Sequence, residues 1–268
     1  MILMTDYELF NLNELNGWII GSEFDKNTPF YSSLFQLGRT NYIYPWKDPK
    51  FHYHTKSIEI YLVLHGELWI IIDEIAIKLK EKSILLVQPG IYHSVIGGKG
   101  LIQHLGMKIP PKEDKKIVKD FKDDYEEIVK KITKSGFNQS PYQQLDPKHG
   151  FIADLKEVSN INCWLIGLWN VKYETEKFCF AYINFKTIEE EKANNHPDHL
   201  HYHSESTEWY FTFKNSQEII VNDEIVKVPE GYLLKIPEGV PHKQSSMTFP
   251  FEGATMRTPI LNDKIILN

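Results

Sequence analysis

The feature that most constrains this chain is a pattern of three histidines and one glutamate that occurs twice with identical spacing. The first copy consists of His52, His54, Glu59 and His93, and the second consists of His201, His203, Glu208 and His242. Each position in the second copy lies 149 residues after its counterpart in the first. Three imidazoles and one carboxylate can hold a divalent transition metal while leaving coordination positions open. The sequence therefore predicts two metal-binding halves in tandem.

The spacing within each copy fits a β-sheet. Alternate residues of a strand point to the same face, so His52 and His54 can converge on one point. Glu59 follows at a distance that allows a tight turn and the start of the next strand, and His93 begins a further strand after Pro89-Gly90. A lone histidine would be read as an ordinary polar surface residue, but a repeated quartet would not. Imidazole and carboxylate together suit iron, manganese, nickel, cobalt, copper or zinc, and we expect one ion per half.

Short apolar segments dominate the rest of the chain. Its 268 residues suit one large domain or two of about 130 residues. The segments are rich in Ile, Val, Tyr and Phe, and turns with Gly, Pro, Asn or Asp separate them, which favours a sandwich or a barrel. The clearest expected strands are 58–64, 68–72, 83–87, 164–171, 178–185, 209–213, 218–221 and 232–236.

One segment has a different period. Residues 112–133 contain no Pro or Gly and carry an apolar residue every three or four positions, which predicts an amphipathic helix. Pro110-Pro111 precedes this segment and Ser135-Gly136 follows it. We therefore expect a first domain over residues 1–110, a linker helix over 111–137 and a second domain over 138–268. Residues 16–21 and 162–167 also resemble each other, which extends the internal duplication.

The two quartets resemble the metal motifs of the cupin superfamily, and their tandem arrangement resembles a bicupin. Gly231, Pro237 and Gly239 precede His242 with the spacing of the second cupin motif. Glu59 is followed by six residues and Gly66, as at the end of the first motif, and Asn215 replaces that glycine in the second copy. Asn tolerates a left-handed turn conformation. The resemblance implies an all-β fold of two tandem jelly-roll (cupin) β-barrels, with the helix connecting them.

Strand alternation also predicts which other side chains face each cavity. Residues two and four positions after each glutamate, and two after each final histidine, should share the ligand face. They are Tyr61, Val63 and Val95 in the first half, and Tyr210, Thr212 and Gln244 in the second. Either tyrosine could equally belong to the core. The second set is the more polar, so we expect more of the chemistry in the second half.

We assign catalytic roles to Tyr210 as a proton donor and to Glu208 as a ligand that shares protons. Tyr61, Thr212, Gln244 and Arg257 are the expected substrate-binding residues. The planar guanidinium group of Arg257 could bind an anionic substrate through two hydrogen bonds. The alternative for this residue is a surface ion pair. His65, His104 and His149 fit no partner pattern, and we treat them as structural or exposed.

The family resemblance implies a metal-dependent enzyme acting on a small oxygenated metabolite, of the dioxygenase, decarboxylase or sugar or keto-acid isomerase type. The alternative is a cupin module that binds a metal or a metabolite without turnover. A storage role is disfavoured because both halves keep their metal ligands. Because fold alone does not establish activity, the reaction type stays open at this point.

Charge and hydropathy bear on partners and location. The net charge is −6, and the sequence shows no basic patch of the kind that nucleic-acid binding requires. We see no apolar window long enough to cross a membrane and no signal-like segment, so we expect a cytoplasmic protein without a membrane partner. Cys163 and Cys179 lie in apolar segments and are expected to be reduced thiols. Barrels of this type often pair through edge strands, which favours a homodimer.

Overall fold

The protein is described by a computed structural model covering residues 6–43, 50–73, 75–120, 130, 145–158, 163–168, 171–194 and 198–267. The chain forms two compact units. The first unit is Asn16–Glu157, and the second unit combines Met1–Leu15 with Val158–Asn268. These bounds differ from the expected domain ends at residues 110 and 137. The first unit reaches further along the chain because residues after the expected linker return to pair with its sheet.

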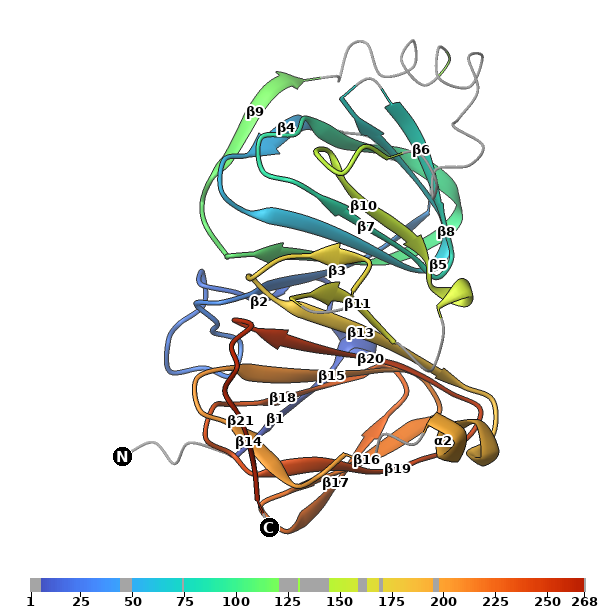
Figure 1. The fold of residues 1–268 in the computed structure, drawn as a ribbon. Helices are drawn as coiled ribbons and strands as arrows, with labels where there is room; N and C mark the ends of the chain where they lie inside the picture. The colour runs from blue at the N-terminus through green and yellow to red at the C-terminus, as the bar shows by residue number, and fades with distance from the viewer. Residues whose placement is uncertain are drawn as a thin grey trace. The chain divides into compact units, whose positions relative to one another are not determined.

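The described strands of the first unit form one nine-stranded sheet (Figure 1). Its main order is β10-β7-β5-β8-β3-β2, while β6 pairs with β5, β4 with β8, and β9 with β4. The strands are β2 (Gly17–Ile20), β3 (Gln36–Ile43), β4 (Lys50–His54), β5 (Ile58–Ile72), β6 (Ile75–Lys80), β7 (Ser83–Val87), β8 (His93–Ile109), β9 (Lys115–Asp120) and β10 (Gly150–Asp154).

The second unit contains two sheets. The larger has the order β1-β18-β15-β20-β13-β11-β12, and the smaller has the order β17-β16-β19-β14-β21. The larger is built from β1 (Glu8–Asn11), β11 (Trp164–Gly167), β12 (Tyr173–Glu174), β13 (Cys179–Phe185), β15 (Thr207–Lys214), β18 (Tyr232–Ile236) and β20 (Phe251–Thr258). The smaller is built from β14 (His201–His203), β16 (Ser216–Val221), β17 (Glu224–Pro229), β19 (His242–Met247) and β21 (Lys264–Ile266).

The expected all-β class is confirmed, but the pairing among the described strands closes no sheet into a barrel. The halves differ because two long strands of the first unit are interrupted in the second. Strand β5 continues through Gly66, whereas Asn215, at φ 61°, separates β15 from β16. Strand β8 continues through its glycine-rich middle, whereas the segment containing Phe249-Pro250 separates β19 from β20. Proline removes a ladder donor, which favours that break.

The expected linker helix is wrong over its first part. Lys115–Asp120 forms strand β9, which pairs antiparallel with β4 so that Lys115 lies opposite His54. The second unit repeats this arrangement, since β21 pairs with β14 and Lys264 lies opposite His203. A strand here provides hydrogen-bond partners for the backbone of β4, which carries two of the histidines. This pairing outweighs the helix that the spacing of the apolar residues predicts. Residues 121–129 and 131–137 of the expected helix lie outside the described part of the chain.

In each unit, one strand at the edge of the sheet comes from the other half of the duplicated sequence. Strand β1 pairs with β18, with Asn11 opposite Tyr232. Strand β10 pairs with β7, with Asp154 opposite Ser83. A short 3-10 helix follows each of these strands, at Leu12–Glu14 and Leu155–Glu157. The duplicated segment therefore begins with a strand that completes the sheet of the other unit.

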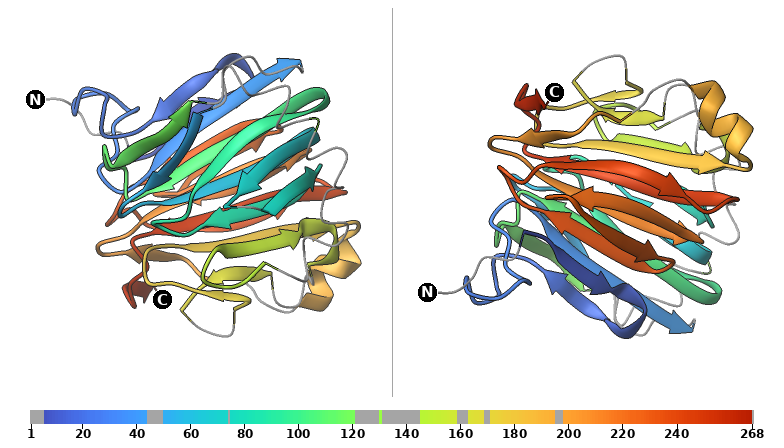
Figure 2. Two further views of the ribbon diagram at one scale, coloured as in Figure 1. Left: turned by 90° about the horizontal axis from the view of Figure 1, so that it is seen from above. Right: turned by 90° about the horizontal axis from the view of Figure 1, so that it is seen from below.

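Buried aliphatic side chains hold each unit together. The core of the first unit draws on β5, β6, β7, β8 and β10, and that of the second draws on β15, β16, β17 and β18. Helix α2 (Ile188–Asn194) stands beside the strands of the second unit (Figure 2). Cys163 and Cys179 are free thiols, as expected. Within the described residues, no helix has the length and apolar character required to span a membrane.

Candidate metal centres

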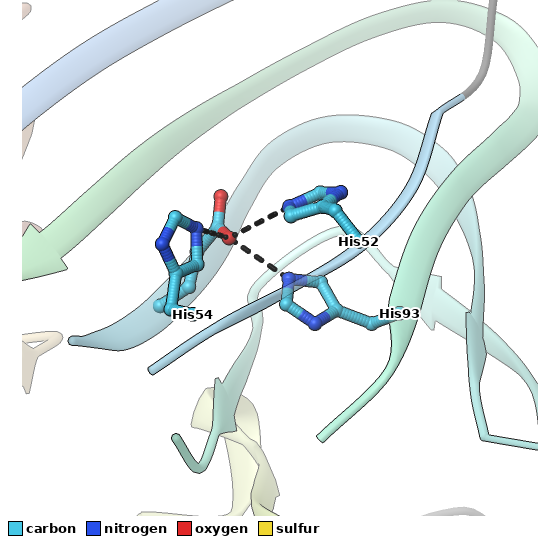
Figure 3. Close-up of side chains that lie close together, drawn as sticks. His52, His54 and His93 are labelled. Carbon is cyan, nitrogen blue, oxygen red and sulfur yellow. Dashed lines mark hydrogen bonds and ion pairs between the residues drawn. The ribbon is translucent and has the colours of Figure 1, made fainter. Parts of the chain in front are cut away.

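The first histidine–glutamate quartet converges on one point inside the first unit (Figure 3). The Nε2 atoms of His52, His54 and His93 lie 3.3, 2.9 and 2.8 Å from Oε2 of Glu59. Strand β4 supplies the first two imidazoles, and His52 lies opposite His93 of β8. All three histidines are buried. The expected placement on three neighbouring strands is confirmed.

The second quartet repeats this geometry in the second unit. The Nε2 atoms of His201, His203 and His242 lie 3.5, 3.2 and 2.8 Å from Oε2 of Glu208. His201 of β14 lies opposite His242 of β19. All four side chains are buried. In both quartets the four candidate donor atoms lie within 4.8 Å of one another.

Hydrogen bonds at the far side of each ring fix which nitrogen faces the centre. Nδ1 of His52 and of His93 donates to the carbonyl oxygens of Lys50 and Ile91 at 2.8 and 2.9 Å. Nδ1 of His201 and of His242 donates to carbonyl oxygens in the same way, at 2.7 and 2.8 Å. A carbonyl only accepts, so Nδ1 carries the proton and the neutral ring presents a lone pair at Nε2. Each centre therefore gathers lone pairs that face one another.

The remaining histidine of each quartet is held by a carboxylate that sequence reasoning missed. Nδ1 of His54 lies 2.8 Å from Oδ1 of Asp114, and Nδ1 of His203 lies 3.1 Å from Oδ1 of Asp263. The two aspartates are 149 residues apart, so continuing the repeat beyond the ligands would have found them. Their other oxygens accept backbone N–H groups of the turn after each histidine pair. A carboxylate behind a ligating imidazole orients the ring and increases its basicity.

The donor set fits a divalent cation. One glutamate oxygen cannot be satisfied by three imidazole lone pairs, so the cluster requires either added protons or a cation. Two donor atoms bound at right angles to an ion with bonds of roughly 2.1 Å lie roughly 3.0 Å apart. The separations between Nε2 and the glutamate oxygen match that spacing, from 2.8 to 3.3 Å in the first centre. The arrangement leaves the identity of the metal open.

The electrostatics of the two centres favour ionised glutamates, whereas the histidines differ. Burial alone would raise the pKa of Glu59, but its interactions with the three surrounding histidines outweigh burial and hold the pKa well below its usual range. The same balance lowers the pKa of Glu208. Burial is the largest influence on His52 and lowers its pKa. Burial alone would lower the pKa of His242, but its hydrogen bond and charge interaction with Glu208 raise it. Burial would also raise the pKa of Asp114, but hydrogen bonds from His54 and the Ser57 and Lys56 amides bring it to about 2.

Tyr61 and Tyr210 occupy equivalent positions beside the two centres. Each ring lies edge-on to the last histidine of its quartet, with centroids 6.2 Å apart for Tyr61–His93 and 6.1 Å apart for Tyr210–His242. Burial and the neighbouring glutamate raise the pKa of both phenols well above the usual value. Both therefore stay protonated and can donate a proton or a hydrogen bond. Both also pack in the cores of their units, as the alternative interpretation expected.

The other expected substrate-binding residues of the second unit are engaged within it. Gln217 donates to Thr212 Oγ1 at 3.0 Å and accepts from Gln244 Nε2 at 2.8 Å. Arg257 points toward the metal ligands, with Nη1 3.1 Å from His203 Nδ1 and Nη2 donating to the carbonyl of Leu261 at 3.2 Å. Its guanidinium therefore contacts a candidate ligand, and it also pairs with the buried carboxylate of Asp263 at 3.9 Å.

A cavity of about 320 Å³ borders the first centre, and the side chains of His52, Glu59 and Tyr61 lie on its wall. Val95 also lines it, as strand alternation predicted, whereas Val63 is fully buried in the core. Further polar groups complete the wall: Lys50 of β4, Ser94 and His104 of β8, Thr40 of β3 and Lys115 of β9. The first site is consequently far more polar than alternation from the ligand strands alone suggested.

No family model matches this chain, and no curated protein matches it by sequence. Solved structures do match. Salicylate 1,2-dioxygenase from Pseudoaminobacter salicylatoxidans, in adducts with gentisate, superposes with a TM-score of 0.61 at 11% identity, over 94% of this chain and 81% of that one. Oxalate decarboxylase from Bacillus subtilis gives 0.53 at 12% identity, over 97% and 78%. The likeness shows a shared fold. The bicupin arrangement that the motifs suggested stays a prediction.

Proposed function

We propose that this chain is a metal-dependent enzyme of the bicupin type that acts on a small oxygenated metabolite. The observation that carries the proposal is the convergence of three imidazole lone pairs on one glutamate oxygen, in each unit. The fold shared with a dioxygenase and a decarboxylase supports it. Dioxygenation, decarboxylation and sugar or keto-acid isomerisation are the reaction types under this proposal.

A divalent metal at such a centre would act as a Lewis acid toward a substrate bound through its oxygen atoms. His52, His54, Glu59 and His93 would hold the ion in the first unit, and Asp114 would keep His54 aimed at it. Tyr61 would donate a proton or a hydrogen bond to a substrate oxygen, since its phenol stays protonated beside the cavity. The glycine-lined cavity would position the substrate next to these groups.

We assign the reaction to the first centre, which revises the sequence-based preference for the second. The cavity with His52 and Glu59 on its wall supports this assignment, because a substrate needs space beside the ligands. Tyr210 and Glu208 would hold the corresponding roles if the second centre also turns over substrate. Otherwise the second ion serves to stabilise its unit.

Metal analysis of the purified protein tests the proposal. We expect two equivalents per chain, falling to one in His52→Ala/His54→Ala and to one in His201→Ala/His203→Ala. The identity of the ion selects the assay, with oxygen uptake for a redox-active metal and proton exchange for a redox-inert one. Absence of metal from protein reloaded with each candidate ion would refute the proposal. Bound metal without turnover of phenols, diketones, organic acids or sugars would favour the non-catalytic binding module.

A further inference from the structure

The wall of the cavity in the first unit carries positive charge without a matching partner. Lys50 of β4 and Lys115 of β9 both line it. Neither lysine forms an ion pair with any residue in the described ranges, although the chain as a whole carries a net charge of −6. Glu59 is the only carboxylate among the lining residues, and the metal ligands surround it. Two lysine side chains therefore line a space whose single carboxylate, Glu59, already belongs to the quartet.

The same wall contains a buried imidazole with spare hydrogen-bonding capacity. His104 is 4% exposed, and its Nδ1 finds no hydrogen-bond partner among the described residues. Its ring lies between two tyrosines, with centroids 6.1 Å from Tyr42 and 6.0 Å from Tyr61. A buried polar nitrogen without a partner is costly unless a ligand or water completes it. Its place on the cavity wall indicates where that partner binds.

Glycines open the space that these groups face. Gly38 and Gly106 lie opposite each other on β3 and β8, and Tyr61 lies opposite Gly106. A Cβ at Gly106 would meet no atom within 4 Å. At Gly38 a Cβ would meet the ring of Trp18, which therefore lies across this glycine as an apolar wall.

Trp164 repeats Trp18 in the second unit, but the unpaired lysines, the histidine and the two glycines do not recur at the equivalent positions. Lys264, the counterpart of Lys115, pairs with Asp198 at 3.2 Å, while the counterpart of Lys50 is His199. Gly253 replaces His104, in the same register opposite β13. The two glycines correspond to Ala181 and Thr255, which lie opposite each other and narrow that position. The two unpaired lysines, the imidazole and the paired glycines are thus specific to the first unit among the positions compared.

We propose that the cavity of the first unit binds a small carboxylate, with Lys50 and Lys115 supplying the charge and His104 a hydrogen bond. The proposal rests on the metal-dependent function assigned to this centre and names its substrate class. The volume of about 320 Å³ fits a small molecule. Trp18 and Val95 add apolar surface, which suits the carbon skeleton of an organic acid better than inorganic phosphate.

Titration calorimetry with malonate, malonamide and inorganic phosphate tests the proposal on the metal-loaded full-length chain. We expect malonate to bind and neutral malonamide to bind at least about tenfold more weakly. Lys50→Gln and Lys115→Gln should each weaken malonate binding by roughly fivefold to tenfold. The matched control Lys264→Gln, which removes the equivalent lysine of the second unit, should leave it unchanged. His104→Leu should weaken binding, and His104→Gln, which keeps a donor, should restore most of it.

Equal affinities for malonate and malonamide, or lysine variants that bind malonate as the unaltered protein does, would overturn the proposal. Tighter binding of phosphate than of malonate through the same two lysines would overturn the carboxylate assignment. Metal content measured on the same samples separates the two levels of inference. Bound metal without malonate selectivity contradicts the substrate class alone, whereas malonate selectivity without any metal contradicts the proposed metal-dependent function.

Discussion

Asp114 accepts a hydrogen bond from Nδ1 of His54 at 2.8 Å and thereby turns the opposite nitrogen of that ring toward Glu59. The aspartate itself is fixed by the amides of Lys56 and Ser57. Asp263 repeats these contacts behind His203. The geometry of each quartet therefore depends on a carboxylate outside the quartet.

Asp114→Asn should weaken metal binding at the first centre by roughly tenfold to a hundredfold. The amide can present its N–H to Nδ1 and so favour the wrong tautomer of His54. Competition against a chelator measures the change. Asp263→Asn should produce the same loss at the second centre only. Glu81→Gln, which alters an exposed carboxylate paired with His65, is the control and should leave both affinities unchanged.

His104 should make the protein less stable in mild acid. Burial lowers its pKa from 6.5 to about 4, so the unfolded chain gains a proton below pH 6.5 that the folded chain accepts only near pH 4. Stability is therefore complete above pH 6.5 and falls between pH 6.5 and 4 by up to about 3 kcal/mol. Urea unfolding across this range measures the loss. The curve of His104→Gln should be flatter by that amount, and parallel curves would contradict the assignment.

Tyr61→Phe and Tyr210→Phe separate the contributions of the two centres. If the first centre performs the reaction, Tyr61→Phe should lower kcat by about a hundredfold, because a positioned proton donor contributes roughly that factor. Tyr210→Phe should leave kcat unchanged. Metal content serves as the control in both variants, since neither phenol is a ligand. The reverse result would restore the original sequence-based assignment of catalysis to the second unit.

Gly106→Thr should fill the first cavity with the residue found at the equivalent place in the second unit. A side chain here meets open space, so unfolding free energy should change by less than about 1 kcal/mol. The KM of the substrate should rise by about tenfold, because the new atoms occupy its volume. Gly66→Ala is the contrasting variant. Its φ of 79° and the adjacent Leu101 carbonyl leave no room for a Cβ, so it should lose at least roughly 1–2 kcal/mol of stability.

The ligand quartets could be predicted from sequence because their spacing expresses local strand geometry. His52 and His54 share a face of β4 whatever the rest of the fold does. His104 gave no such signal, and we expected it to be structural or exposed. Strand alternation would not have helped, because His104 is an odd number of residues from His93 and would face away from the ligands. Register shifts in the pairing of β5 with β8 change the alternation between these two positions. A local pattern does not reveal such irregularities. The sequence repeat gave no help either, because the position equivalent to His104 in the second half is Gly253 and not a second histidine.

Strand β9 shows a different limit. The longer segment that contains it, residues 112–133, carries apolar residues with a helical period, yet Lys115–Asp120 pairs with β4 as a strand. A signal was nevertheless present, because Asp114 and Lys115 match Asp263 and Lys264 at the same offset as the ligands. Following the duplication to its end would have moved the boundary of the first half beyond residue 110. Strand β10 could not have been found in this way, since its partner lies in the preceding repeat.

The exchanged edge strands make the two halves of this gene product interdependent during biogenesis. Residues Glu8–Asn11 leave the ribosome long before Tyr232–Ile236, the segment they must pair with, has been translated. Until then both edges stay open to unwanted partners, a hazard that nascent-chain chaperones exist to limit. Severing the polypeptide between the repeats would leave each fragment missing one strand. To regain function, the separated fragments would then have to associate and exchange those strands.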